Sequence, residues 1–163
     1  MSLAPTICFT FDIDWAPEFM IDELRTLLAE HALPATVFCT HESDATRRLL
    51  ALDHVEHGLH PNFLVAREEA QVLDDLRGLY PGARVARNHA LYYHSRLLAL
   101  LHRAGIEAFS NTLMFLEPGL HPHYDWSGLV RLPIFWEDDV HAVFFDGAFD
   151  GAASARAVLA LER

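Results

Sequence analysis

The sequence lacks lysine altogether, so all 12 of its basic residues are arginines. This absence excludes a phosphate-binding loop with its lysine, a Schiff-base enzyme and a Ser-Lys dyad. The arginines are outnumbered by 23 acidic residues, and the formal net charge of -11 would repel nucleic acid and anionic lipid. We therefore expect neither nucleic acid nor a membrane surface as a partner.

Cysteine and long apolar runs are scarce as well. The two cysteines, Cys8 and Cys39, lie in apolar segments, and no secretory signal precedes them. We interpret them as buried free thiols, which places the protein in the reducing cytoplasm. No segment approaches the roughly 20 apolar residues of a membrane span. Because 52% of the 163 residues are hydrophobic, we expect residues 1–163 to form a single domain.

Strand-like and helical segments alternate up to residue 110, which predicts parallel βαβ units and an α/β fold. Apolar, β-rich runs predict strands at residues 6–11, 35–39, 55–60, 83–87 and 106–110. Apolar residues at helical spacing, with Ser43 and Ser95 as N-caps, predict helices at residues 22–31, 44–52, 66–79 and 96–104.

Beyond residue 111 the alternation is less regular. Residues 117–127 are rich in proline, glycine, histidine and aromatic residues, and we interpret them as an ordered loop over a site. Residues 129–135 and 140–145 are predicted to be strands, and residues 152–161 a helix.

Asp12 and Asp14 follow the first predicted strand. Side chains alternate along a strand, so both carboxylates point to one face. They also stand at the carboxyl end of the strand, where parallel α/β folds place their sites. Two neighbouring carboxylates repel each other unless a cation lies between them, which indicates a divalent metal ion. A pair of solvated acids is the alternative interpretation.

Two later segments offer the other groups that such a site needs. His60 ends the third strand at the same edge as Asp14, and an imidazole beside a carboxylate is a typical ligand pair for zinc. Arg87 and His89 share a face if the fourth strand extends that far, which would bring the guanidinium to the aspartates and the imidazole to the metal. His57 points the other way and is interpreted as a packing or surface residue.

Four segments in order, TFDID at 10–14, ATVF at 35–38, EHGLHPN at 56–62 and RNH at 87–89, resemble successive motifs of the polysaccharide deacetylases. These are metal-dependent carbohydrate esterases with a NodB homology domain. The resemblance covers roughly the first 110 residues. It implies a distorted or incomplete (β/α) barrel and the hydrolysis of an N- or O-acetyl group on a carbohydrate, either a small molecule or a polysaccharide.

The resemblance also implies roles for individual residues. Asp12 would be the general base that deprotonates a metal-bound water, and Arg87 would keep it ionised and oriented. Asp14 and His60 would hold a divalent metal ion, for which zinc is the expected identity. Asp139, or Asp138 beside it, resembles a late acidic motif that orients a catalytic histidine, although exposed loop acids are an equal interpretation.

The sequence departs from the family pattern at two points. The position of a second metal histidine holds Leu64, which leaves the third ligand open between His89, favoured by geometry, and Asn62. The closing motif that supplies a histidine as general acid is not visible after Phe145. Other histidines are candidates for that role, namely His121, His123 and His141.

Two alternatives follow from these departures. One is a catalytically degenerate relative that binds sugars or regulates. Aromatic side chains that stack on sugar rings could serve it or the enzyme, although most are interpreted as ordinary core residues; the candidates are Trp15, Tyr92, Tyr93, Tyr124, Trp126 and Trp136. The lesser alternative is a haloacid-dehalogenase-type phosphatase using Asp12 and Asp14, although such an enzyme normally needs a lysine. An incomplete barrel would also expose strand edges, which favours a homo-oligomer.

Overall fold

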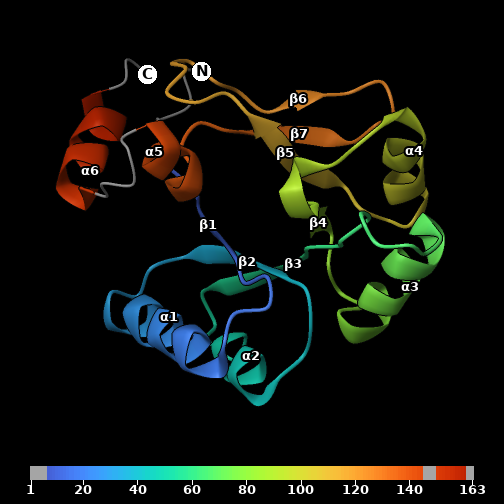
Figure 1. Ribbon diagram of the computed structural model, residues 1–163, viewed down its shortest axis with the longest axis horizontal. Coiled ribbons are helices and arrows are strands. Elements are labelled where there is room, and N and C mark those ends of the chain that lie inside the picture. The colour runs from blue at the N-terminus through green and yellow to red at the C-terminus, as the bar shows by residue number, and fades with distance from the viewer. Residues whose placement is uncertain (1–6, 145–149, 161–163) are drawn as a thin grey trace.

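The computed structural model describes residues 7–144 and 150–160 (Figure 1). Its strands form one sheet in the order β1-β2-β3-β4-β5-β7-β6. The strands are β1 (Phe9–Asp12), β2 (Ala35–Cys39), β3 (Val55–Leu59), β4 (Val85–Ala86), β5 (Ala108–Leu113), β6 (His123–Tyr124) and β7 (Val130–Ile134). The helices are α1 (Glu18–Glu30), α2 (Asp44–Leu49), α3 (Glu69–Leu79), α4 (Ser95–Arg103), α5 (Asp138–Phe144) and α6 (Gly151–Ala160), with a 3-10 turn η1 (His89–Leu91).

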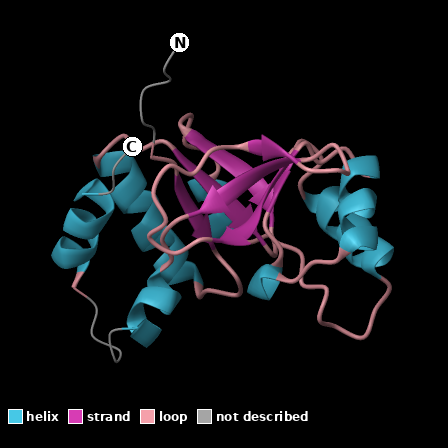
Figure 2. Ribbon diagram, turned by 90° about the horizontal axis from the view of Figure 1, so that it is seen from above, coloured by secondary structure: helices cyan, strands magenta, loops and turns pink. Residues whose placement is uncertain are grey.

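The sheet is parallel from β1 through β5 to β7, and only β6 runs antiparallel to its neighbour β7. Helices separate the first five strands in sequence, and Figure 2 shows the strands in the middle with helices on both flanks. The predicted α/β class is therefore confirmed. The open, mostly parallel sheet is consistent with a distorted barrel, in which all parallel strands end at one common edge.

The core lies between this sheet and the helices that cover it. Helix α1 contributes Ile21 and Leu28, which are seven residues apart and so lie on one face. Phe38 of β2 and Phe109 of β5 are buried within the sheet. This packing holds the carboxyl ends of the strands in place, and it therefore positions the residues that directly follow them.

Two predictions about individual elements are wrong. Residues 140–145 were expected to be a strand, but they fall largely in α5, whose first turn carries Asp138 and Asp139. Acids at this position favour a helix N-terminus, and this signal outweighs the apolar spacing. His94 rather than Ser95 caps α4, because His94 Nδ1 accepts the backbone N–H of Leu97 at 3.4 Å.

The other expectations for local structure meet mixed outcomes. Ser43 caps α2 as predicted, since its hydroxyl accepts the Thr46 N–H at 3.1 Å. Both cysteines are free, but only Cys39 is buried; Cys8 is exposed, because it precedes β1 instead of lying inside it. Burial raises the pKa of the Cys39 thiol to about 12. The loop predicted at residues 117–127 contains the short strand β6. Among the described residues, no helix is both long and apolar enough to span a bilayer.

Candidate metal centre and active site

The candidate site lies at the edge where the parallel strands β1, β3 and β4 end. Asp12 is the last residue of β1, His60 directly follows β3, and Arg87 directly follows β4. Asp14 and His89 lie in the turns beyond β1 and β4. The structure thus brings together the five residues for which the sequence predicts the base, its arginine and three metal ligands.

The three candidate ligands have spacings that suit one ion. Asp14 Oδ1 lies 3.2 Å from His60 Nε2 and 2.9 Å from His89 Nδ1. One potential ligand atom from each of the three residues lies within 4.8 Å of the others. Tetrahedral zinc holds N and O ligands at about 2.0–2.2 Å, which separates two ligands by ~3.3 Å. One carboxylate and two imidazoles at these distances fit a divalent metal ion.

His60 is the buried member of this cluster, with 3% of its surface exposed. Burial lowers its pKa, although the neighbouring charges of Asp12 and Asp14 oppose the shift. The imidazole is therefore neutral near pH 7, which is the form that binds a metal. Its Nδ1 lies 3.8 Å from Asp12 Oδ1 and has no hydrogen-bond partner among the described residues.

His89 reaches the cluster by a route that the sequence did not indicate. β4 ends at Ala86, so Arg87 and His89 do not share a strand face, and the predicted extension of the strand is wrong. Instead, η1 turns the chain back, with Ala90 (φ 54°) and Leu91 (φ 50°) in the left-handed region. Such strain persists only where the surroundings hold it, and it is common at functional sites.

Two buried asparagines hold this turn. Asn111 Oδ1 accepts the backbone N–H of Asn88 at 2.8 Å, and Asn111 Nδ2 donates to the Leu91 carbonyl at 2.6 Å. Asn88 Nδ2 in turn donates to the Tyr92 carbonyl at 2.8 Å. Sequence reasoning missed Asn111. Its position at the end of the fifth predicted strand was the available signal, because that end faces the same edge.

Arg87 connects β1, β4 and β5. Its guanidinium donates to Asp12 Oδ1 at 3.0 Å, to the Thr10 hydroxyl at 2.9 Å, and to the Ser110 carbonyl and hydroxyl at 3.0 and 2.9 Å. Only 7% of the Arg87 side chain is exposed. A guanidinium has five N–H donors in one rigid plane, so this set of four bonds is specific to arginine. Arg87 therefore fixes the orientation of Asp12.

The ring of Phe38 packs against the Arg87 guanidinium, and Gly58 leaves room for that ring. Arg87 Cζ lies 4.6 Å from the centre of the Phe38 ring. Phe38 pairs with Gly58 across β2 and β3, and a Cβ on Gly58 would lie 2.7 Å from Phe38 Cδ1. Only glycine leaves room for the ring there. The motif residue Gly58 thus acts on the site through Phe38.

Burial raises the pKa of Asp12, although the charges of Arg87 and His60 oppose the shift. The guanidinium therefore limits the shift and does not reverse it. A carboxylate with a raised pKa is a stronger base, which suits proton abstraction. The geometry around Asp12 is that of an oriented base beside a potential metal site.

Glu137 was not identified by sequence reasoning. It is partly buried, follows β7 at the same edge, and interacts electrostatically with both Asp12 and Arg87. Burial and the nearby charge of Asp139 raise its pKa to about 6. No local pattern marks Glu137, because its environment arises when the end of β7 approaches the end of β1.

The remaining candidates lie outside this cluster. Asp139 is exposed in the first turn of α5, where its carboxylate accepts the Val140 N–H at 2.6 Å. Leu64 is exposed, and the Asn62 side chain accepts the Leu64 N–H at 2.9 Å. His57 packs against Tyr80, with ring centroids 5.8 Å apart, as a packing residue should.

The three histidines considered as general acid differ in exposure. His121 and His123 are exposed, whereas His141 is buried between Trp136 and Ser154. Trp15 lies at the open side of the site, where its ring meets His89 edge-on at 5.2 Å between centroids. The site is accessible there, since 46% of the Asp14 side chain is exposed.

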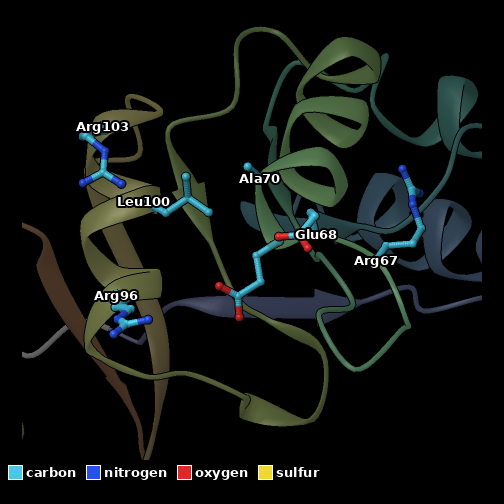
Figure 3. A pocket seen from close by; sticks show the side chains of 7 residues that line it. Arg67, Glu68, Ala70, Arg96, Leu100 and Arg103 are labelled. Carbon is cyan, nitrogen blue, oxygen red and sulfur yellow. The ribbon is translucent and has the colours of Figure 1, made fainter.

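A surface hollow of about 320 Å³ lies elsewhere, between α3 and α4 (Figure 3). Arg96 and Arg103 line it from α4, and Glu68 lines it from the start of α3. Glu69, also in the lining, pairs with His94 Nε2 at 2.7 Å. None of the predicted site residues lines this hollow.

The family model of the WbmS-like polysaccharide deacetylases matches residues 9–157. This chain belongs to that family. The match extends well beyond the motifs of the first 110 residues, and it gives no support to the phosphatase alternative. A search of curated proteins found no match.

Two solved structures resemble this chain. One is a Bordetella bronchiseptica protein assigned as a polysaccharide deacetylase of O-antigen biosynthesis, with 32% identity and a TM-score of 0.78; the match covers 88% of this chain and 62% of that protein. The other is a Mycobacterium smegmatis protein assigned as a polysaccharide deacetylase, with 19% identity and a TM-score of 0.57, covering 79% and 58%. The second supports the fold alone. This chain spans less than two thirds of either protein.

Proposed function

We propose that this member of the polysaccharide deacetylase family is a metal-dependent hydrolase that removes an N- or O-acetyl group from a carbohydrate. The observation that carries the proposal is the cluster of Asp14, His60 and His89 beside an aspartate that Arg87 orients. The Bordetella relative is assigned to O-antigen biosynthesis, so sugars of surface polysaccharides are the substrate class to test first.

Asp14, His60 and His89 would hold the ion, and their donor set favours zinc. A divalent ion supplies Lewis-acid activation of water and of the acetyl carbonyl. Asp12 takes the proton from the attacking water, because Arg87 holds its carboxylate in place and burial makes it more basic.

Glu137 is the group we assign to protonate the leaving amine or hydroxyl. Its pKa of about 6 keeps part of the population protonated near neutral pH, and it stands within the electrostatic reach of Asp12. Of the three histidines considered from the sequence, His121 and His123 are exposed, and His141 packs against Trp136 and Ser154. The role of Asp139 stays a prediction, as does the cytoplasmic location.

A catalytically degenerate, sugar-binding relative is the competing function. Leu64 at the position of a second metal histidine favours it, because it removes a ligand that other family members use. Arg87 and Asp12 favour catalysis, since a pure binding protein needs no buried arginine to orient a base.

The first test is the metal content of the purified, dialysed protein, measured by elemental analysis. We expect close to one zinc, iron, nickel or cobalt ion per chain, and its loss in Asp14→Ala and His60→Ala. His57→Ala is the matched control, since His57 lies in β3, the strand that directly precedes His60 in the chain, but packs against Tyr80. Metal retention in His60→Ala would contradict the assigned ligands.

The second test is turnover of acetylated sugars by the metal-loaded protein. Asp12→Asn should lower kcat/KM by about 10²–10⁴, the usual contribution of a general base. Its metal content should remain that of the unmodified protein. Full metal occupancy without any turnover would favour the sugar-binding alternative.

A further inference from the structure

A second hollow, of about 400 Å³, opens beside the hairpin formed by β6 and β7. This volume falls within the usual range for ligand sites. We call it the hairpin hollow, and its lining includes Tyr93, Thr112, His123, Asp125, Trp126 and Arg131. None of the candidate metal ligands belongs to it.

Trp126 gives this surface an apolar face. It is 71% exposed, and Tyr93, in the loop before α4, is 48% exposed. Large aromatic side chains exposed around a hollow mark binding surfaces more often than isolated apolar residues do. Their flat faces suit a ligand that presents C–H groups on one side and hydroxyls on its rim.

The hairpin turn holds Trp126 in a defined position. Asp125 Oδ1 accepts both the backbone N–H and the hydroxyl of Ser127 at 2.6 Å, and Gly128 closes the turn with a φ of 94°. The Gly128 N–H donates to the Asp125 carbonyl at 3.1 Å. Binding therefore needs little ordering of this turn, which lowers its entropic cost.

Polar groups in the hairpin hollow carry no net charge. Arg131, whose side chain is 7% exposed, pairs with Asp125 at 3.2 Å and donates to the Thr112 hydroxyl at 2.6 Å. Its guanidinium also lies 4.9 Å from the centre of the Tyr93 ring. These two hydrogen bonds use two of the five N–H donors of a guanidinium. The Asp125 carboxylate cancels the arginine charge, so the hollow suits a neutral ligand rather than an anion.

One short chain segment, residues 89–93, links the proposed active site to the hairpin hollow. Tyr93 lies four residues after His89, so their Cα atoms are at most ~14 Å apart. Asn88 Nδ2 also donates to the Tyr92 carbonyl, which fixes this connection. A carbohydrate of several rings can span such a distance while one of its acetyl groups occupies the active site.

We propose that the hairpin hollow is a subsite for a neutral sugar ring of an oligosaccharide or polysaccharide substrate, stacked on Trp126. This inference rests on the proposed carbohydrate substrate. It adds that the protein recognises a chain longer than a monosaccharide.

Calorimetric titration with N-acetylglucosamine and its dimer, trimer and tetramer tests the subsite. The titrations use Asp12→Asn as the parent protein, so that no substrate is consumed. We expect affinity to rise with chain length in the parent, and Trp126→Ala to bind the tetramer at least ~10-fold more weakly, as for a central aromatic contact. Binding of the monosaccharide should not change. Trp126 is too exposed for its loss to affect folding.

Tyr124→Ala is the matched control. Tyr124 is 80% exposed on the same hairpin but does not line the hollow, because it lies next to His123 and points to the opposite face of β6. This variant should bind the tetramer as the parent does. Equal affinities for the parent and Trp126→Ala, or no gain with chain length, would overturn the subsite.

Two further measurements separate this inference from the proposed function. Zinc binding, titrated in the same variants, should not depend on Trp126. A Trp126-dependent affinity for the tetramer in a protein that binds no zinc would retain the subsite and refute the metal-dependent hydrolase. Sedimentation of the parent and of Trp126→Ala tests the other occupant, a second copy of this chain. A dimer that dissociates on this substitution would refute the subsite.

Discussion

Replacing Arg87 with methionine should destabilise the protein strongly. Methionine keeps apolar contact with Phe38 but removes the guanidinium and its four hydrogen bonds. Removing one member of a buried ion pair costs about 3–5 kcal/mol. Because the Asp12 side chain remains 22% exposed, water stabilises its unpaired charge in part, and we expect the lower end, about 3 kcal/mol.

Urea unfolding at pH 7, followed by tryptophan fluorescence with a chelator present, measures this loss. The chelator keeps changes in metal binding out of the comparison. Arg84→Met is the control, because Arg84 forms an exposed pair with Glu107 and its loss should cost under about 1 kcal/mol. A loss in Arg87→Met no larger than in Arg84→Met would refute the reasoning.

The double variant Asp12→Asn/Arg87→Met separates lost charge from lost packing. It should be more stable than Arg87→Met alone, because a neutral amide leaves no unpaired charge behind. The deficit of Arg87→Met should likewise shrink as the pH falls, since protonation of Asp12 removes the same charge. A double variant that is less stable than Arg87→Met would show that packing, and not charge, dominates.

Two further variants address Glu137 and Gly58. The folded state raises the pKa of Glu137 from 4.5 to about 6, so stability should fall as the pH rises through this interval, and Glu137→Gln should remove that fall. Above pH 6 the variant should be more stable than the unmodified protein by about 1 kcal/mol. The full pKa shift would give roughly 2 kcal/mol, but solvent screens a half-buried group. Calorimetric scans at pH 4 and 7 measure this, and an equal change in the stability of both proteins between the two pH values would contradict it. Gly58→Ala should cost about 1–3 kcal/mol by displacing Phe38, and kcat/KM should fall because Phe38 supports Arg87. Gly78→Ala is the control, because no atom of the described residues lies near the added methyl group on α3, and it should be neutral or stabilising in the same urea unfolding. If Gly58→Ala and Gly78→Ala changed stability equally, a clash between the methyl group added in Gly58→Ala and Phe38 would be excluded.

The sequence predicts the first five strands and the helices between them well, because each βα unit carries its own local signals. The strand at 35–39 has the predicted bounds, and Ser43 begins α2 as expected. The order of the motifs also brings Asp12, Asp14 and His60 to one edge, since parallel strands share their direction. These inferences need only periodicity, caps and strand polarity.

What the sequence could not predict depends on contacts between distant segments. Strand alternation correctly predicts that His89 lies near Asp14, but the predicted strand does not extend to His89. His89 instead reaches Asp14 through a strained turn that Asn111 holds. The pKa of Glu137 depends on burial and on charges from other elements. α5 was missed because Val140 and Phe144 also fit an alternating pattern. Tertiary context decides each case, and local propensity does not.

The connections of Arg87 also impose an order on folding. Its partners Thr10 and Ser110 are separated from it by 77 and 23 residues, so both contacts close long loops and carry a large entropic cost. The βα units that contain β1, β2 and β3 make mainly local contacts and can associate earlier. During synthesis, Asp12 emerges from the ribosome long before Ser110, and the arginine finds its complete set of partners only once β5 has emerged. Arg87 therefore reaches its final arrangement beside Asp12 only after β5 has joined the sheet.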